Sequence, residues 1–125
     1  MAALRLALAQ YDFPVGAVAA NTAKVRELMA QARAGHASLA VFPELTISGY
    51  PPEDLLLRPS FLAACQDAMQ ELAAETNGLT AIVGFPHSLG EVYNAAAFLR
   101  GGLIVEITHK QVLPNYGVFD DKRYF

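Results

Sequence analysis

Two charged side chains stand where apolar strands end, and together they could carry out acid–base chemistry. Glu44 follows the run Ala40–Pro43, and Lys110 follows the run Leu103–His109. In α/β sheets, functional groups gather just past the carboxyl ends of strands. A glutamate at such a place can take a proton from a thiol, and a lysine can stabilise the oxyanion of a tetrahedral intermediate. If the two strands run parallel, we expect both side chains at the same end of the sheet.

Taken singly, each of these two residues has a simpler explanation as an exposed charge, because most charged side chains lie in water. The context of Glu44 weakens that explanation, since the residue directly follows an apolar strand and Pro43 and precedes a loop rich in Gly and Pro. A Glu–Lys pair also has nothing that attacks a carbonyl carbon. The chemistry therefore needs a nucleophile, which in this setting would be a cysteine.

Short apolar runs predict the strands that position these residues. We expect strands at residues 4–11, 38–42, 79–85, 92–99 and 103–108, with the third strand buried on both faces. The sequence Arg100–Gly102 predicts a tight hairpin between the last two strands. The tail, Gln111–Phe125, is dense in Pro, Asn, Gly and Asp and is expected to be a loop.

Apolar residues at helical spacing predict two helices between these strands. The first is expected to begin with Asn21 as its N-cap and to end at Gly35. The second is expected to begin with Ser60 as its N-cap and to reach about Thr76. This order of elements predicts an α/β fold, in which one mixed sheet carries both helices on one face.

Length and composition exclude several classes of protein. The 125 residues fit one small domain. The net charge of −3, without a basic patch, argues against a nucleic-acid partner, and no stretch has the length of a membrane helix. A single cysteine excludes an internal disulfide and favours a reducing, cytoplasmic location. The three histidines lack partners at metal-ligand spacing, so we expect no metal site.

Two stretches carry a resemblance to a known family. Residues 42–55, FPELTISGYPPEDL, resemble the catalytic-glutamate motif of the nitrilase, or carbon–nitrogen hydrolase, superfamily. Residues 109–125, HKQVLPNYGVFDDKRYF, resemble its catalytic-lysine motif, in the form found in the glutaminase domain of glutamine-dependent NAD+ synthetases. Val83–Pro86 and Tyr93–Ala95 stand where that family has its middle strands. The similarity extends over the whole chain.

The resemblance implies a Glu–Lys–Cys triad that hydrolyses glutamine to glutamate and ammonia. By position, Glu44 matches the general base and Lys110 matches the group that stabilises the transition state. Tyr50, Tyr116 and Phe119 match residues that line the glutamine pocket, although plain aromatic packing is the alternative for all three. The resemblance also implies a fold, namely half of an αββα sandwich. The second half of that sandwich would cover an apolar face of the sheet.

The family's cysteine follows the lysine and a further strand, so we expect it beyond Phe125. Cys65 precedes Lys110 and belongs to the apolar stripe of the second helix, which predicts an inert core thiol. We therefore interpret residues 1–125 as the N-terminal part of a glutaminase domain, which lacks the synthetase domain and is inactive by itself.

The same resemblance implies an ATP-dependent parent enzyme that amidates the deamido form of NAD+. ATP and Mg²⁺ would serve the synthetase domain, and this segment itself needs no cofactor. Expected partners are glutamine, the remainder of the chain and further copies of the same protein in a homo-oligomer. Two alternatives stay open: another amidase or carbamoylase of the superfamily, and a binding or assembly module that kept the fold without the nucleophile.

Overall fold

The computed structural model describes residues 4–111, 115–116, 119–120 and 124–125. Its elements, in chain order, are β1 (Leu6–Leu8), α1 (Val18–Ala34), β2 (Leu39–Val41), the 3₁₀ helix η1 (Glu53–Leu57), α2 (Pro59–Ala73), β3 (Thr80–Leu89), β4 (Glu91–Arg100), β5 (Leu103–His109), β6 (Asn115–Tyr116) and β7 (Phe119–Asp120). The predicted order of strands and helices is confirmed through β5, with η1 as an additional short helix.

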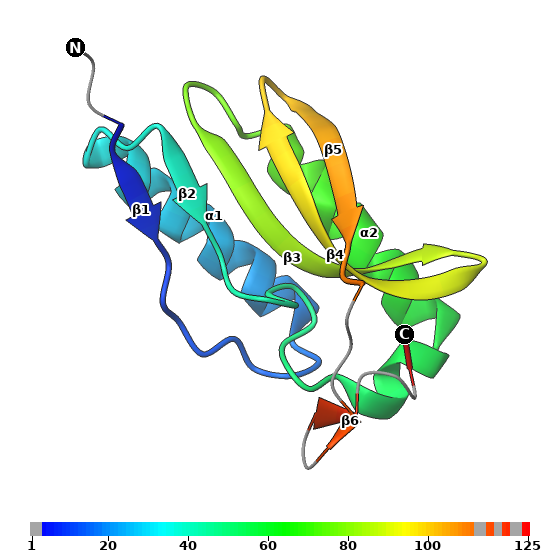
Figure 1. Cartoon of the computed structure of the whole chain (residues 1–125). Coiled ribbons are helices and arrows are strands. Elements are labelled where there is room, and N and C mark those ends of the chain that lie inside the picture. Colours follow the sequence, from blue (N-terminus) through cyan, green and yellow to red (C-terminus); the bar gives the residue numbers. More distant parts are fainter. Residues whose placement is uncertain (1–3, 112–114, 117–118, 121–123) are drawn as a thin grey trace.

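The five longer strands form one mixed sheet in the order β1-β2-β3-β4-β5. Strands β1, β2 and β3 pair in parallel, and β4 is antiparallel to both of its neighbours. Strand β5 therefore runs in the same direction as β2, and the arrowheads of both point to the same end in Figure 1. We call this the carboxyl end of the sheet, and the opposite one the amino end.

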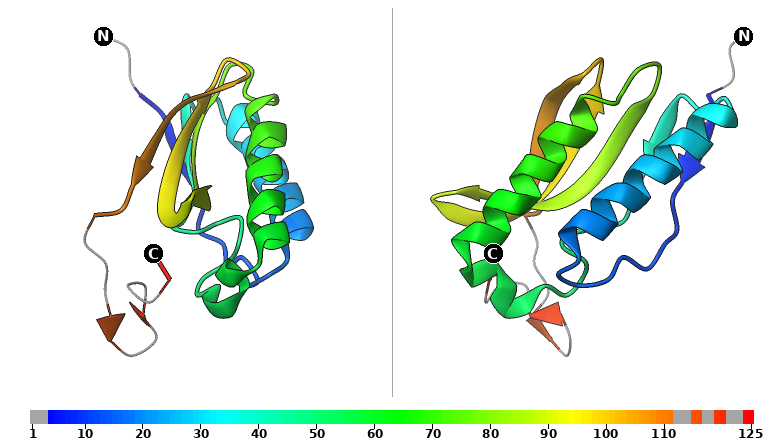
Figure 2. Two further views of the ribbon diagram at one scale, coloured as in Figure 1. Left: turned by 90° about the vertical axis from the view of Figure 1, so that its right-hand side faces the viewer. Right: turned by 180° about the vertical axis from the view of Figure 1, so that it is seen from behind.

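Both helices cover one face of the sheet, as the sequence predicted, and the right-hand view of Figure 2 shows them side by side in front of it. Alternate strand residues point into the layer between sheet and helices. They include Ala40, Ala81, Val83, Phe85, Ala97 and Leu99, all at most 1% exposed. Val25 and Met29 of α1 and Leu72 of α2 meet them there. Complete burial of such a side chain contributes about 1.5–3 kcal/mol.

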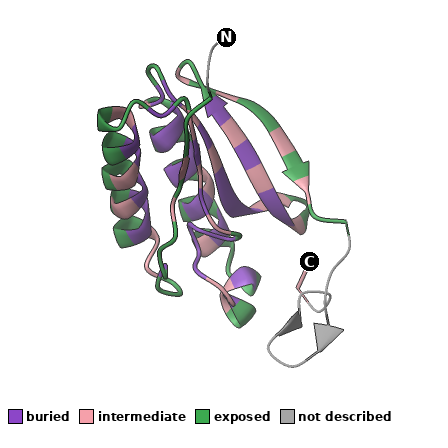
Figure 3. Cartoon of the chain, turned by 60° about the vertical axis from the view of Figure 1, so that its left-hand side comes forward, coloured by how far each residue is buried: buried purple, intermediate pink, exposed green. Residues whose placement is uncertain are grey.

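The other face of the sheet has no helix on it in the described residues. Its side chains alternate with those of the core and are apolar but only half-buried, as for Val41, Ile82 and Phe98. At one edge of the sheet, Leu6 and Leu8 of β1 are 50% and 67% exposed. At the other edge, Figure 3 shows more exposed residues on β5 than on the neighbouring strands. The expected apolar, uncovered face is thus present.

Both predicted helix starts were wrong. Helix α1 begins at Val18, and Asn21 lies inside it with 1% exposure instead of capping it. Helix α2 begins at Pro59 after Arg58 and ends at Ala73, so Ser60 is not its N-cap. Proline is favoured in the first turn because its missing N–H has no partner there in any case. Gly35 is the C-cap of α1, as expected.

The tail is not entirely loop, because β6 and β7 pair antiparallel within it. Among the described residues, none of the helices is long and apolar enough to cross a membrane.

Candidate active site

Glu44 and Lys110 meet at the carboxyl end of the sheet. Glu44 follows β2, and Lys110 directly follows β5. The Lys110 Nζ lies 2.7 Å from Glu44 Oε1, and the two side chains are 33% and 45% exposed. The parallel direction of the two strands therefore brings together residues that are 66 positions apart.

A third residue, Asn94 of β4, completes this contact. Its Nδ2 donates a hydrogen bond of 2.6 Å to the same oxygen, Glu44 Oε1. Its backbone carbonyl accepts a hydrogen bond of 2.8 Å from the Lys110 backbone N–H. Asn94 is 4% exposed, so it joins the carboxylate and the lysine from within the sheet. Asn94 is not among the residues predicted from the sequence; the available signal was an amide inside a largely apolar strand.

Gly84 of β3 lets the chain after β2 pass close to the sheet. A Cβ built at Gly84 would lie 2.6 Å from the Leu45 backbone nitrogen and 2.8 Å from the Pro43 carbonyl oxygen, so no larger residue fits. The Ile47 N–H donates back to the Gly84 carbonyl at 3.3 Å. Leu45 is fully buried with φ at 48°, a left-handed conformation that tertiary packing must hold. Close packing against β3 thus fixes the backbone that carries Glu44.

A second loop packs against the same segment from the other side. The side-chain amide of Asn21 donates to the carbonyls of Pro14 at 2.9 Å and Ile47 at 3.0 Å. The Gly16 N–H donates to the Ser48 carbonyl at 2.8 Å. A buried amide must find such partners because an unpaired one costs free energy. Asn21 therefore ties the loop before α1 to the loop that carries Glu44.

The Glu44–Lys110 pair borders a cavity of about 330 Å³. Its walls are the chain after β2 and the uncovered face of β3, β4 and β5, including Phe42, Ile82, Ala96 and Thr108. The half-buried Tyr50 is not among the described residues of this wall, so its contact with glutamine stays a prediction. Tyr116 and Phe119 pair through their backbones, but their side chains lie outside what the structure describes.

Cys65 is a core residue, as its place on the helical stripe predicted. It is fully buried between α2 and the sheet, and burial raises the pKa of its thiol to about 12. A thiol in that state supplies almost no thiolate near neutral pH, and it faces away from the cavity beside Glu44. Within the described residues, the cavity is therefore bordered by a carboxylate and an ammonium group but by no cysteine thiol.

An aromatic cluster lies on the helix side of the same end of the sheet. His87 Nδ1 and His109 Nε2 are 3.1 Å apart, and Tyr93 stacks on His109 with ring centroids 4.2 Å apart. Burial lowers the pKa of His87 below its ordinary value, and the neighbouring His109 lowers it further. His109 of this cluster also lines the cavity beside Glu44, so the cluster supports the site from the helix side of the sheet.

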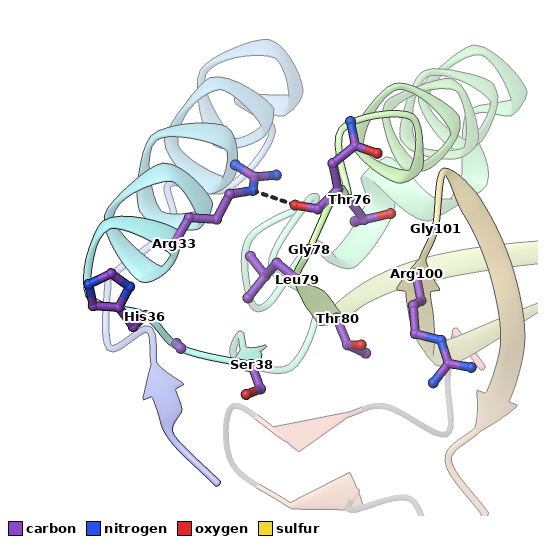
Figure 4. Close-up of a pocket in the computed structure, with 11 residues that line it drawn as sticks. Arg33, His36, Ser38, Thr76, Gly78, Leu79, Thr80, Arg100 and Gly101 are labelled. Atoms are coloured by element: carbon purple, nitrogen blue, oxygen red, sulfur yellow. Dashed lines mark hydrogen bonds between the residues drawn. The ribbon is translucent and has the colours of Figure 1, made fainter.

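A larger hollow, of about 650 Å³, lies at the amino end of the sheet. Figure 4 shows that its polar side chains do not converge: Arg33 reaches toward the loop after α2, Arg100 extends away from it, and His36 lies at the far side. Arg33 donates to the backbone carbonyls of Glu75 and Asn77, so its guanidinium is engaged. This hollow is less suited to bind a small ligand than the cavity beside Glu44.

In the part of the chain that the structure describes, no group of three or more His, Cys, Asp and Glu side chains could hold a metal ion.

Comparison with known proteins defines the class to which this site belongs. Residues 5–125 match the family model described as carbon-nitrogen hydrolase. The chain therefore belongs to the carbon–nitrogen hydrolase family. An amidase from Nesterenkonia sp. shares the fold, with a TM-score of 0.76 at 21% identity over 91% of this chain and 44% of the amidase.

More similar relatives are glutamine-dependent NAD(+) synthetases. That of Xanthomonas campestris is 57% identical over 98% of this chain and 22% of its own length, and that of Thermotoga maritima is 44% identical over 100% and 22%. The structure of the Acinetobacter baumannii enzyme superposes with a TM-score of 0.92 at 41% identity, over 98% of this chain and 23% of that chain. This chain thus spans less than a quarter of the synthetases that it matches.

Proposed function

We propose that this chain is the N-terminal part of the glutaminase domain of a glutamine-dependent NAD+ synthetase, and that Glu44 and Lys110 are two members of its catalytic triad. The observation that carries the proposal is the 2.7 Å contact between Lys110 Nζ and Glu44 Oε1 beside a cavity. The similarity to synthetases over nearly the whole chain supports the choice of reaction. Amidases of the same fold share far less sequence with it, which makes a general amidase the second candidate.

In the proposed reaction, Glu44 takes the proton of a cysteine thiol. The sulfur attacks the side-chain amide carbon of glutamine, and Lys110 stabilises the oxyanion that forms. The protonated Glu44 then gives its proton to the departing nitrogen, which leaves as ammonia and a thioester remains. Water, deprotonated by Glu44, hydrolyses the thioester to glutamate and restores the thiol.

The nucleophile in this proposal comes from beyond residues 1–125, because Cys65 is the chain's one cysteine and is buried. We therefore expect the 125-residue chain alone to hydrolyse no glutamine. Glutamine turnover by this chain that Cys65→Ser abolishes would contradict this expectation.

The remaining parts of the proposal concern the parent protein. Its synthetase domain would use ATP and Mg²⁺ to amidate deamido-NAD+ with the released ammonia. The uncovered apolar face of the sheet would be covered by the remainder of the chain. We further propose that the parent protein is a cytoplasmic homo-oligomer.

The test uses the full-length parent protein with Glu44→Gln. General acid–base groups typically contribute about 10²- to 10⁴-fold to rate, so glutamine-dependent formation of NAD+ should fall by that factor. Formation of NAD+ from free ammonia should be unchanged, since it bypasses the glutaminase site. The matched control is Glu71→Gln, on a helix surface with its side chain 64% exposed, which should leave both activities intact.

Each outcome has a distinct meaning. If Glu44→Gln retains the wild-type glutamine-dependent rate, Glu44 is not the base. If the wild-type protein hydrolyses other amides but not glutamine, the second candidate, a general amidase, replaces the proposal.

A further inference from the structure

We infer that Asn94 is a positioning residue that holds Glu44 so that Oε2, and not Oε1, exchanges the proton with the nucleophile and the leaving group. The inference rests on the proposed function, because it assigns a role within the same amide hydrolysis. It adds a residue to the site and specifies the reacting atom of the base.

The hydrogen bonds of the carboxylate are divided unequally between its two oxygens. Glu44 Oε1 accepts from Asn94 Nδ2 at 2.6 Å and from Lys110 Nζ at 2.7 Å. A carboxylate oxygen has about two lone-pair sites, so these two donors occupy Oε1. No hydrogen bond to Glu44 Oε2 is formed within the described residues, and Oε2 is therefore the oxygen available to take a proton.

The two donors differ in how firmly they are held. Lys110 is 33% exposed and has a long, flexible side chain. Asn94 is 4% exposed and lies on β4, which is paired on both sides, with β3 and with β5. Strand pairing holds its backbone, because Asn94 is in register with Pro86 and its carbonyl accepts from the Lys110 N–H. The amide thus fixes the carboxylate from a rigid element, which is the arrangement that a catalytic group requires.

The proposed reaction requires one rigid donor and one mobile donor, which Asn94 and Lys110 provide. In the transition state, the Lys110 ammonium must also interact with the oxyanion, and its contact with Glu44 must then weaken or be shared. The Asn94 amide keeps its bond to Oε1 throughout, so the carboxylate does not rotate when Lys110 changes partner. Being neutral, the amide also restrains the carboxylate without adding a second charge to the site.

The chemical environment of Asn94 supports a role in the site over one in packing. The strand continues with the small residues Ala95, Ala96 and Ala97, of which two are buried in the core. A buried amide in such a strand costs free energy unless it is hydrogen-bonded. Within the described residues, its side chain is hydrogen-bonded to Glu44, so the side chain serves the carboxylate rather than the sheet ladder.

The experiment uses the full-length parent protein with Asn94→Ala and Asn94→Asp, and measures kcat and KM for glutamine hydrolysis. Misplacement of a catalytic group by about 1 Å can cost about 100-fold, so we expect kcat to fall about 10- to 100-fold in Asn94→Ala, with KM within about threefold. Asn94→Asp keeps the size of the side chain but, when ionised, replaces the donor by a second carboxylate. It should therefore lose at least as much kcat.

The control for structural damage is Thr76→Val, at the amino end of the sheet. Thr76 is fully buried and makes two hydrogen bonds, to the Ala73 carbonyl at 2.7 Å and from the Gly102 N–H at 3.1 Å. The Thr76→Val variant should have a lower melting temperature, as Asn94→Ala should, but its kcat should equal that of the wild type.

The outcomes separate this inference from the proposed function. Wild-type kcat in Asn94→Ala, or a loss of kcat in Thr76→Val as large as in Asn94→Ala, would overturn the positioning role while Glu44→Gln still tests the site. Absence of glutamine hydrolysis by the wild-type protein would overturn both.

Discussion

The two ends of the sheet show that a site depends on convergent side chains rather than on the size of a hollow. At the carboxyl end, a cavity of about 330 Å³ is bordered by three polar side chains that meet at one oxygen atom, Glu44 Oε1. At the amino end, the hollow has about 650 Å³ and cationic side chains that point in different directions. Of the two hollows, the smaller one therefore has the convergent polar side chains that acid–base catalysis requires.

The backbone explains the difference between the two ends. The chain after β2 is held at the carboxyl end by its close approach to Gly84 and by the amide of Asn21. At the amino end, the walls are turns and helix ends, and Arg33 is used to bond the carbonyls of Glu75 and Asn77. The carboxyl end therefore holds Glu44 in place, whereas at the amino end the polar side chain of Arg33 stabilises the fold.

Among the variants that compare the two ends, we expect the largest effect from Gly84→Ala, which changes the carboxyl end through the backbone. The new Cβ would collide with the backbone of Pro43 and Leu45. We expect the free energy of unfolding to fall by about 1–3 kcal/mol, and kcat/KM for glutamine to fall about 100-fold because Glu44 moves. Chemical denaturation and steady-state kinetics of the full-length protein measure the two effects.

Gly35→Ala is the matched control for Gly84→Ala. Gly35 has a φ of −82° and ordinary contact distances around its position for a Cβ, the nearest being 3.5 Å. The Gly35→Ala variant should hydrolyse glutamine at the wild-type rate. Equal losses in the two variants would show that the close approach at Gly84 is not special.

A smaller effect, on stability alone, is expected from Arg33→Met at the amino end. Arg33 donates to the carbonyls of Glu75 and Asn77, so its loss should lower the free energy of unfolding by about 1 kcal/mol. Arg100→Met is the control, since the described residues offer Arg100 no hydrogen bond or ion pair, and it should stay within about 0.5 kcal/mol of the wild type. A marked loss of glutamine hydrolysis in either variant would contradict the contrast between the two ends.

The smallest effect concerns pH and the cluster behind Lys110. The pKa of His87 is lowered in the folded protein by burial and by His109, so the unfolded chain binds this proton more readily. Stability is therefore lost as pH falls through the ordinary value of 6.5. His87→Asn should flatten this loss in melting temperature below about pH 6.5, whereas His36→Asn, at an exposed turn, should leave the slope unchanged. Identical slopes in the two variants would exclude His87 as the source.

Much of the architecture could be predicted from local patterns. Short apolar runs identified the strands, and the helical stripe correctly placed Cys65 in the core. Local patterns failed where a residue had a distant partner. Asn21 was assigned to a helix cap because Asn favours that position, but its amide bonds the carbonyls of Pro14 and Ile47.

The sequence by itself determined the order of the elements, their α/β class and the placement of Glu44 and Lys110 after apolar strands. It could do so because side-chain periodicity and strand ends are local properties of the chain. Only the tertiary structure decided that β2 and β5 run parallel, that Asn94 meets Glu44 across 50 residues, and that both donors bind one oxygen. These contacts depend on strand order and register, which are set by packing over the whole sheet and not by any single segment.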